Sequence, residues 1–337
     1  MILGGLQKRN LAGLALLVAL VLLALALPGA PAEAALKRAV LQLDWTPNTN
    51  HTGIYVALDK GWYAEEGVDL TVVTPGADTN VIALVAAGRA QFGVSFQEFM
   101  SSARTEGVPV VSVAAVVQHN TSGFASIGRG IKRAADFEGK RFGGWGLDIE
   151  RAILKGMMAA DGADVEKVQF VGIPGSMDLV TALQRDIDFT WIYYGWQGVE
   201  AELRGIELDI VMMEDYFDAV PDYYTPILIT SEALIARDPE LVRAFVHATA
   251  RGYEFAAEHP EEAARILLKY APENDPELVL ASQKWLSPRY IADAPGFGVQ
   301  KREVWKRFGD WMYENGLISR PFDADSAFTN EFLPAAE

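Results

Sequence analysis

Short apolar segments alternate with segments of helical pattern from residue 35 onward. Residues 40–45 alternate apolar and polar positions and predict a strand, while residues 108–117 form a nearly continuous apolar run, typical of a strand buried on both faces. Between these strands, Asp78 is expected to cap a helix that extends to Ala87 and ends at Gly88. The same half of the chain predicts strands at 68–74 and 91–95 and a helix at 96–105.

A second strand–helix cycle follows the polar stretch at 128–132. An apolar strand at 227–230 comes directly after residues 221–226, which therefore predict a second crossing between two lobes, and the chain beyond is predicted to be helical. The pattern predicts an α/β fold with a cleft and two hinge crossings, in which lobe 1 holds residues 35–123 and 225–337 and lobe 2 holds 124–224. The second cycle contains predicted strands at 140–143, 168–171, 187–193 and 208–213, with helices at 148–160, 176–184 and 196–203.

The first 34 residues have the features of a Sec signal peptide. Lys8 and Arg9 precede an apolar run at 11–27, and Ala32-Glu33-Ala34 forms a cleavage site. The run is at the short end for a membrane-spanning helix, which disfavours a retained anchor. The chain contains no cysteine, so a lipid anchor on an N-terminal cysteine, disulfides and a thiol nucleophile are excluded. We therefore expect a soluble periplasmic protein that is not a lipoprotein.

The composition of the chain limits the classes of molecule that it is expected to bind. The net charge is -16, and removal of residues 1–34 makes the chain about one unit more acidic. Nucleic acid and anionic lipid surfaces both require a basic face, so neither is an expected partner. The four histidines lack metal-ligand spacing and no G-x-S-x-G motif occurs, so the sequence predicts neither a metal site nor a cofactor nor a catalytic centre.

The first strand leads into a dense group of polar and aromatic side chains. Asp44, Trp45, Asn48 and His51 follow it within a Pro/Asn turn. Such a group at the carboxyl end of a strand is typical of a ligand-binding rim. Trp45 can stack on a ring or pack in the core, and Asp44 or Asn48 can pair with N–H groups. His51 can donate to a ring nitrogen or only cap the next helix.

The second lobe carries a matching candidate. Tyr193, Tyr194 and Trp196 stand at the end of the strand predicted at 187–193, and at least one of them is expected to face the cleft. Gln197 and Glu200 follow and can read a polar ligand edge, although Glu200 equally suits a solvated helix face.

A glycine-rich turn supplies a third rim element. Residues 143–148 contain Trp145, a candidate ligand contact, and their backbone N–H groups stand before a helix, where they can hold an anion or a ring carbonyl. His119, after the last strand of the first half, is expected to form hinge hydrogen bonds.

Three segments resemble the periplasmic substrate-binding proteins of ABC importers. They are residues 60–68, 84–94 (with Gln91 in place of the usual Asp) and 237–264. The resemblance implies a type II periplasmic binding protein fold. Residues 44–53 further resemble the thiamine-pyrimidine-precursor binding (ThiY-like) group, which is similar to riboflavin-binding RibY-like receptors and to thiamine pyrimidine synthases.

The resemblance implies a monomeric receptor that captures a flat heteroaromatic ligand by lobe closure and delivers it to an inner-membrane ABC permease. An aminopyrimidine of the formylaminopyrimidine or hydroxymethylpyrimidine type is the expected ligand. Riboflavin is the alternative, because the many aromatic side chains suit a larger ring. An exported synthase-like enzyme is disfavoured, because those synthases carry a cysteine-rich motif and this chain has no cysteine.

Overall fold

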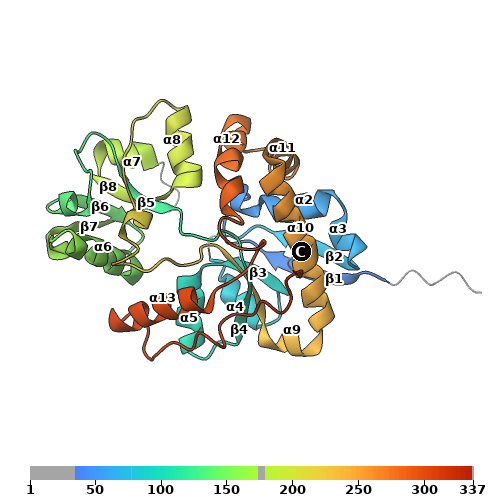
Figure 1. The fold of residues 1–337 in the computed structure, drawn as a ribbon. Helices are drawn as coiled ribbons and strands as arrows, with labels where there is room; N and C mark the ends of the chain where they lie inside the picture. The colour runs from blue at the N-terminus through green and yellow to red at the C-terminus, as the bar shows by residue number, and fades with distance from the viewer. Residues whose placement is uncertain (1–34, 77, 174–178, 336–337) are drawn as a thin grey trace, which may run out of the picture. The chain divides into compact units, whose positions relative to one another are not determined.

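The computed structural model describes residues 35–76, 78–173 and 179–335, and the predicted signal peptide lies outside them. Within the described chain, two five-stranded sheets form two lobes (Figure 1). The lobe 1 sheet has the order β2-β1-β3-β10-β4, and the lobe 2 sheet has the order β7-β6-β8-β5-β9. The strands are β1 (Lys37–Gln42), β2 (Val68–Val73), β3 (Phe92–Ser95), β4 (Val110–Ala115), β5 (Ser122–Ser126), β6 (Arg141–Gly144), β7 (Gln169–Gly172), β8 (Phe189–Tyr193), β9 (Asp209–Met212) and β10 (Ile227–Ser231).

Each sheet contains one strand that runs against its neighbours. β10 is antiparallel to β3 and β4, and β5 is antiparallel to β8 and β9. These are the strands that the chain enters directly after each crossing between the lobes, so both sheets have the same mixed topology. The predicted α/β fold of two lobes with two crossings is confirmed.

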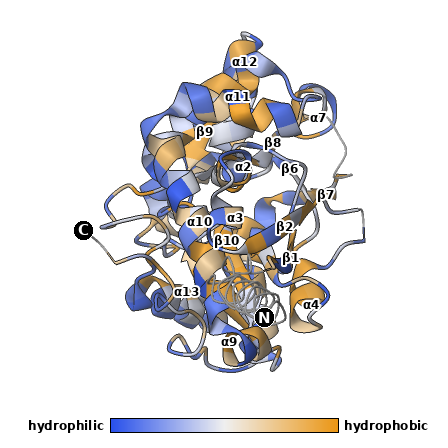
Figure 2. Ribbon diagram, turned by 90° about the vertical axis from the view of Figure 1, so that its right-hand side faces the viewer, coloured by the Kyte–Doolittle hydropathy of each residue, from blue (hydrophilic) through white to orange (hydrophobic). Residues whose placement is uncertain are grey.

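Helices cover both sheets, and their residues alternate between hydrophilic and hydrophobic, as α10 and α11 show in Figure 2. Among the described residues, no helix has the length and apolar character needed to cross a membrane. Lobe 1 carries η1 (Thr49–His51), α2 (Thr52–Asp59), α3 (Trp62–Glu65), α4 (Val81–Ala86), α5 (Gln97–Thr105), α9 (Glu232–Arg237), α10 (Pro239–Glu258), α11 (Pro260–Tyr270), α12 (Pro276–Leu286) and η6 (Ser287–Arg289). Lobe 2 carries η2 (Ala134–Phe137), α6 (Asp148–Ala160), η3 (Val165–Lys167), α7 (Leu179–Arg185), the π-helix η4 (Tyr194–Gly198), α8 (Val199–Leu203) and η5 (Met213–Tyr216).

The last helix, α13 (Arg302–Glu314), contacts the cores of both lobes. Its Trp305 packs with residues behind the lobe 1 sheet, while Phe308 and Trp311 pack among residues of lobe 2. The predicted lobe boundaries at 123, 124 and 225 therefore stay a prediction, because the C-terminal segment contacts both lobes.

One local prediction is wrong, one strand was missed, and the start of one predicted helix lies outside the described residues. The cap of α4 is Asn80, whose side chain accepts the N–H of Ala83, and not Asp78. Strand β5 has the sequence Ser-Gly-Phe-Ala-Ser, whose small and polar residues give no strand pattern, and the sequence analysis missed it. The helix predicted at 176–184 begins at Leu179 within the described chain, and residues 174–178 lie outside it.

Two glycines allow α2 and α10 to touch. A methyl group added to Gly252 would overlap the carbonyl group of Gly53, and one added to Gly53 would overlap the ring of Tyr253. Because α2 begins directly after the Pro/Asn turn, this contact also fixes where that turn lies relative to α10.

We expect Gly252→Ala to lower the free energy of unfolding by about 3 kcal/mol, because the two helix backbones must move apart. Urea unfolding measures the loss. Gly296→Ala is the matched control, since nothing lies near the position of its added methyl group. Equal stability of the two variants would contradict this packing.

His119 joins the two crossings. Its Nδ1 lies 2.6 Å from Asp222 Oδ2 on the return crossing, and its Nε2 lies 3.0 Å from Asp293 Oδ1. The hydrogen bond to Asp222, aided by Asp293, raises the pKa of His119 above its usual 6.5. The expected hinge role of His119 thus matches its contacts.

A raised histidine pKa stabilises the protein below pH 6.5, and this contribution disappears as the pH rises through the raised value. We expect the stability difference between the wild type and His119→Ala to be larger at pH 5.5 than at pH 9. Because the side chain is half exposed, the difference should stay below about 1 kcal/mol. Thermal unfolding at both pH values measures it. The control is His259→Ala, at a surface histidine. If the stability loss of His119→Ala changes between pH 5.5 and pH 9 no more than that of His259→Ala, the assigned role of His119 is contradicted.

Candidate functional site

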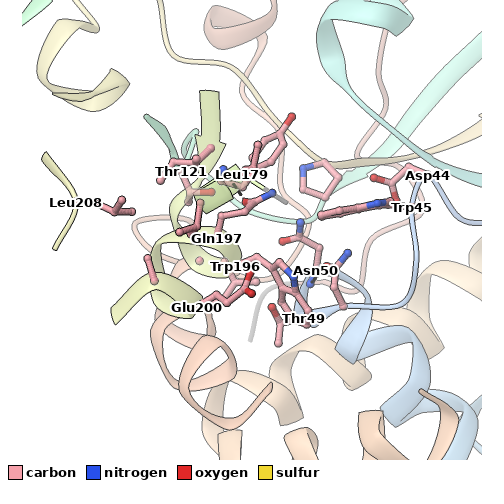
Figure 3. A pocket seen from close by; sticks show the side chains of 18 of the residues that line it. Asp44, Trp45, Thr49, Asn50, Thr121, Leu179, Trp196, Gln197, Glu200 and Leu208 are labelled. Atoms are coloured by element: carbon pink, nitrogen blue, oxygen red, sulfur yellow. Dashed lines mark hydrogen bonds between the residues drawn. The ribbon is translucent and has the colours of Figure 1, made fainter. Parts of the chain in front are cut away.

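A cavity of about 440 Å³ lies between the two lobes. Figure 3 shows Asp44, Trp45, Thr49 and Asn50 lining it from lobe 1, and Trp196, Gln197, Glu200 and Leu208 lining it from lobe 2. Of the ten residues predicted to bind ligand, eight line this cavity: Asp44, Trp45, Asn48, Trp145, Tyr193, Trp196, Gln197 and Glu200.

His51 and Tyr194, the other two predicted residues, do not line the cavity. The His51 side chain is completely buried. Tyr194 turns away, where its hydroxyl donates to Glu202 and its ring packs on Trp285 of α12. Any influence of these two side chains on a ligand must therefore pass through their neighbours.

Both nitrogens of His51 are used inside the rim. The Asn48 backbone N–H donates to His51 Nδ1 at 3.2 Å, so in the neutral ring Nε2 carries the hydrogen. His51 Nε2 therefore donates to Asp44 Oδ1 at 2.7 Å. This arrangement holds the Asp44 carboxylate against the cavity and leaves Oδ2 to accept a ligand N–H.

The rim turn is held by the C-terminal helices through its own carbonyl groups. Three buried or half-buried side chains from that part of the chain donate to three carbonyls of the turn, which fixes its shape. The donors are Asn274 Nδ2 to Pro47 O (2.8 Å), Tyr290 Oη to Thr49 O (2.7 Å) and Tyr253 Oη to Asn50 O (2.6 Å).

The side-chain amides of Asn48 and Asn50 make different contacts. Both polar atoms of the Asn48 side chain form hydrogen bonds within the turn, because Oδ1 accepts the N–H of Asn50 and Nδ2 donates to Thr46 O. The Asn50 side chain lines the cavity and has no hydrogen-bond partner among the described residues. Sequence reasoning missed Asn50; its signal was a second amide within the motif.

Two tryptophans from opposite lobes border the cavity, and each is 42% exposed. The Trp145 loop is held by the buried Glu150, whose carboxylate accepts the N–H groups of Trp145 (3.0 Å) and Leu147 (2.9 Å). These N–H groups were expected to hold an anion or a ring carbonyl from a ligand. That expectation is wrong for these two, because Glu150 already occupies them.

The π-helix η4 presents the lobe 2 candidates. The Tyr193 N–H donates to Gln197 Oε1 at 3.0 Å, which leaves the Gln197 amide nitrogen without a partner in the described chain. Glu200 pairs with Arg204 at 3.3 Å and remains partly exposed. Ser282 on α12 donates to the Gly195 carbonyl and also bonds Thr49, so this segment rests directly on lobe 1.

Seven apolar side chains of lobe 2 also line the cavity, and sequence reasoning did not identify them as lining residues. Six of them fall within predicted strands or helices and Ile173 lies outside those ranges, and only the fold shows which of them meet. They are Ile173, Leu179, Val180, Leu183, Ile192, Ala201 and Leu208.

The charges of the cavity are all of one sign. Among the described lining residues, Asp44 and Glu200 are the charged side chains, and no lysine, arginine or histidine joins them. The described residues also contain no cluster of three or more His, Cys, Asp or Glu side chains that could hold a metal ion. An acidic, aromatic cavity suits a neutral or cationic ring with N–H donors, because a buried anion would lack a partner.

Two sheets of this topology with a cavity between them define a binding-protein fold. Solved structures show the same fold: the periplasmic aliphatic sulphonate binding protein SsuA from Escherichia coli has a TM-score of 0.68 and 14% identity, with 89% of this chain and 94% of that one covered. The chain belongs to the NMT1/THI5-like family, whose model matches residues 48–263.

Relatives in this family bear different names. A formylaminopyrimidine-binding protein from Halalkalibacterium halodurans is 32% identical (88% of this chain, 91% of the relative). A 4-amino-5-hydroxymethyl-2-methylpyrimidine phosphate synthase from Legionella pneumophila is 28% identical (88% and 92%). The riboflavin-binding protein RibY from Chloroflexus aurantiacus is also 28% identical (92% and 90%).

We expect His51→Ala to lower the free energy of unfolding by about 2–4 kcal/mol, because it leaves a cavity and removes the partner of a mostly buried carboxylate. Urea unfolding tests this. His247→Ala, at a half-buried histidine outside the rim, serves as the control, and an equal loss in both variants would contradict the assigned role.

Proposed function

We propose that this protein is the periplasmic substrate-binding component of an ABC importer and that it captures an aminopyrimidine precursor of thiamine. The observation that carries the proposal is the acidic, aromatic cavity between the lobes, which contains no basic side chain in the described chain. The family membership and the formylaminopyrimidine-binding relative support it.

In this function the ring stacks on Trp45 and Trp145, which border the cavity from opposite lobes. Each such stacking contact adds roughly 0.5–1.5 kcal/mol beyond area burial. The Asp44 carboxylate accepts from the ring amino group, and the free amides of Asn50 and Gln197 complete the polar edge. Ligand held by both lobes then favours the closed form, which the permease recognises.

The relatives named as synthases raise an enzymatic alternative. Phosphate recognition ordinarily uses Arg or Lys, and neither lines the cavity among the described residues. The chain also has no cysteine. We therefore propose a binding protein without catalytic chemistry, exported by its signal peptide, monomeric, and partnered by an inner-membrane permease.

Riboflavin is a second candidate ligand because seven apolar side chains of lobe 2, among them Ile173 and Leu208, line the cavity together with the polar rim. A flavin would place its tricyclic ring along these side chains. Visible absorption and native mass of the purified protein separate the two ligands, since flavin gives a yellow protein and an aminopyrimidine gives a small colourless adduct.

We expect Trp45→Ala to weaken binding of formylaminopyrimidine at least about tenfold, because it removes a stacking face while the fold is kept. Isothermal titration calorimetry measures the affinity. Trp62→Ala, at a tryptophan outside the cavity, is the matched control and should bind as the wild type does. Unchanged affinity in Trp45→Ala would refute the stacking role, and saturable binding of riboflavin alone would select the second candidate.

A further inference from the structure

One buried acid stands outside the rim that we assign to ligand binding. Glu98 lies in the first turn of α5, beside the cavity-lining Phe96, and is only 6% exposed. Its Oε2 has no hydrogen-bond partner in the described chain. A buried carboxyl without a cation is costly in its ionised form, so its presence here calls for a role.

Glu98 belongs to a polar cluster at the hinge. The cluster joins α5, the first crossing with β5, and the return crossing. Gln97 Oε1 accepts the Tyr224 N–H at 2.7 Å, which ties α5 to the return crossing. The members with a buried side-chain atom that lacks a partner among the described residues are Gln97, Glu98, Asn120, Ser122, Tyr223 and Thr225.

Two buried tyrosine hydroxyls, those of Tyr193 and Tyr223, lie within electrostatic range of the Glu98 carboxyl. Burial, followed by the charge of Glu98, raises the pKa of Tyr193 and of Tyr223. Burial raises the pKa of Glu98 itself to about 8, so the carboxyl is protonated at neutral pH. A protonated carboxyl carries no charge, so it can remain among these buried groups without a cation.

Tyr193 connects this cluster to the ligand site, because its ring lines the cavity and its hydroxyl lies beside Thr225. Further acids act on the two phenols: Asp44 from lobe 1 and Glu150 from lobe 2 on Tyr193, and Asp222 of the return crossing on Tyr223. No basic side chain acts on either phenol in the described residues, so ionisation of Glu98 would add an uncompensated charge.

We propose that the buried Glu98 carboxyl, in its uncharged form, is a positioning residue for ligand capture: an uncharged group lets α5 and the two crossings pack closely in the closed form and thereby seats Tyr193 against the cavity. Loss of its proton requires water to reach the cluster, which separates the crossings and favours the open form. The ligand step of this proposal rests on the proposed function, whereas the hinge step does not.

The first test needs no ligand. Infrared spectra of the wild type at pH 7 should contain a protonated-carboxyl band that disappears near pH 8 to 9 and is absent from Glu98→Gln. Small-angle scattering should show that the wild type expands between pH 7 and pH 9.5 while Glu98→Gln does not. Glu66→Gln, the same change at an exposed position, should behave as the wild type. A wild-type spectrum without the band at pH 7 overturns the proposal, and this measurement requires no variant.

The second test measures affinity for formylaminopyrimidine from pH 6 to 9.5 by calorimetry. Wild-type affinity should fall above pH 8, by up to about tenfold per pH unit, relative to Glu98→Gln at the same pH. Glutamine is uncharged and nearly equal in size to a protonated glutamate, so the two proteins should bind equally at pH 6.5. Parallel pH profiles overturn the positioning role, since a purely structural carboxyl would alter only stability. Absence of binding in both proteins, with the infrared and scattering results intact, would contradict the proposed ligand and leave the hinge role supported.

Discussion

The hydrogen bond between His51 and Asp44 is the contact on which the ligand side of lobe 1 depends. It joins Asp44, two residues after the end of β1, to His51, the residue that precedes α2, and the imidazole is completely buried. Because Nδ1 accepts the Asn48 N–H, the proton of the neutral ring is on Nε2, which points at the Asp44 carboxylate. The carboxylate is therefore oriented before any ligand arrives, which reduces the entropy lost on binding.

In lobe 2, a buried acid likewise fixes the position of a cavity-lining segment. Glu150 holds the Trp145 loop by two backbone N–H groups, much as His51 and the C-terminal side chains hold the turn in lobe 1. Each side of the cavity is thus rigid within its own lobe. The remaining freedom lies at the crossings, where His119 binds two aspartates and where Glu98 stands among polar atoms that lack partners in the described chain. Rigid sides and a polar hinge are what lobe closure requires.

Local signals predicted most of the fold, because capping and strand patterns act over a few residues. The helix predicted at 148–160 matches α6, which runs from Asp148 to Ala160. Strand β5 was missed because its small polar residues are specified by pairing with β8 and β9, which are far away in sequence. His51 carries no local sign of burial, and the hydrogen bonds of its ring to Asp44 and to the Asn48 N–H are visible only in the structure.

The charge of the cavity separates functions that the shared fold leaves open. Binding proteins and synthases occur together among the relatives, so the family alone does not choose between them. A phosphorylated ligand placed beside Asp44 and Glu200 would meet two carboxylates and no basic side chain of the described lining, so like charges would raise its free energy. An unphosphorylated aminopyrimidine instead presents N–H donors to the same carboxylates. The sign of the cavity charge therefore favours capture of a free precursor over chemistry on a phosphate ester.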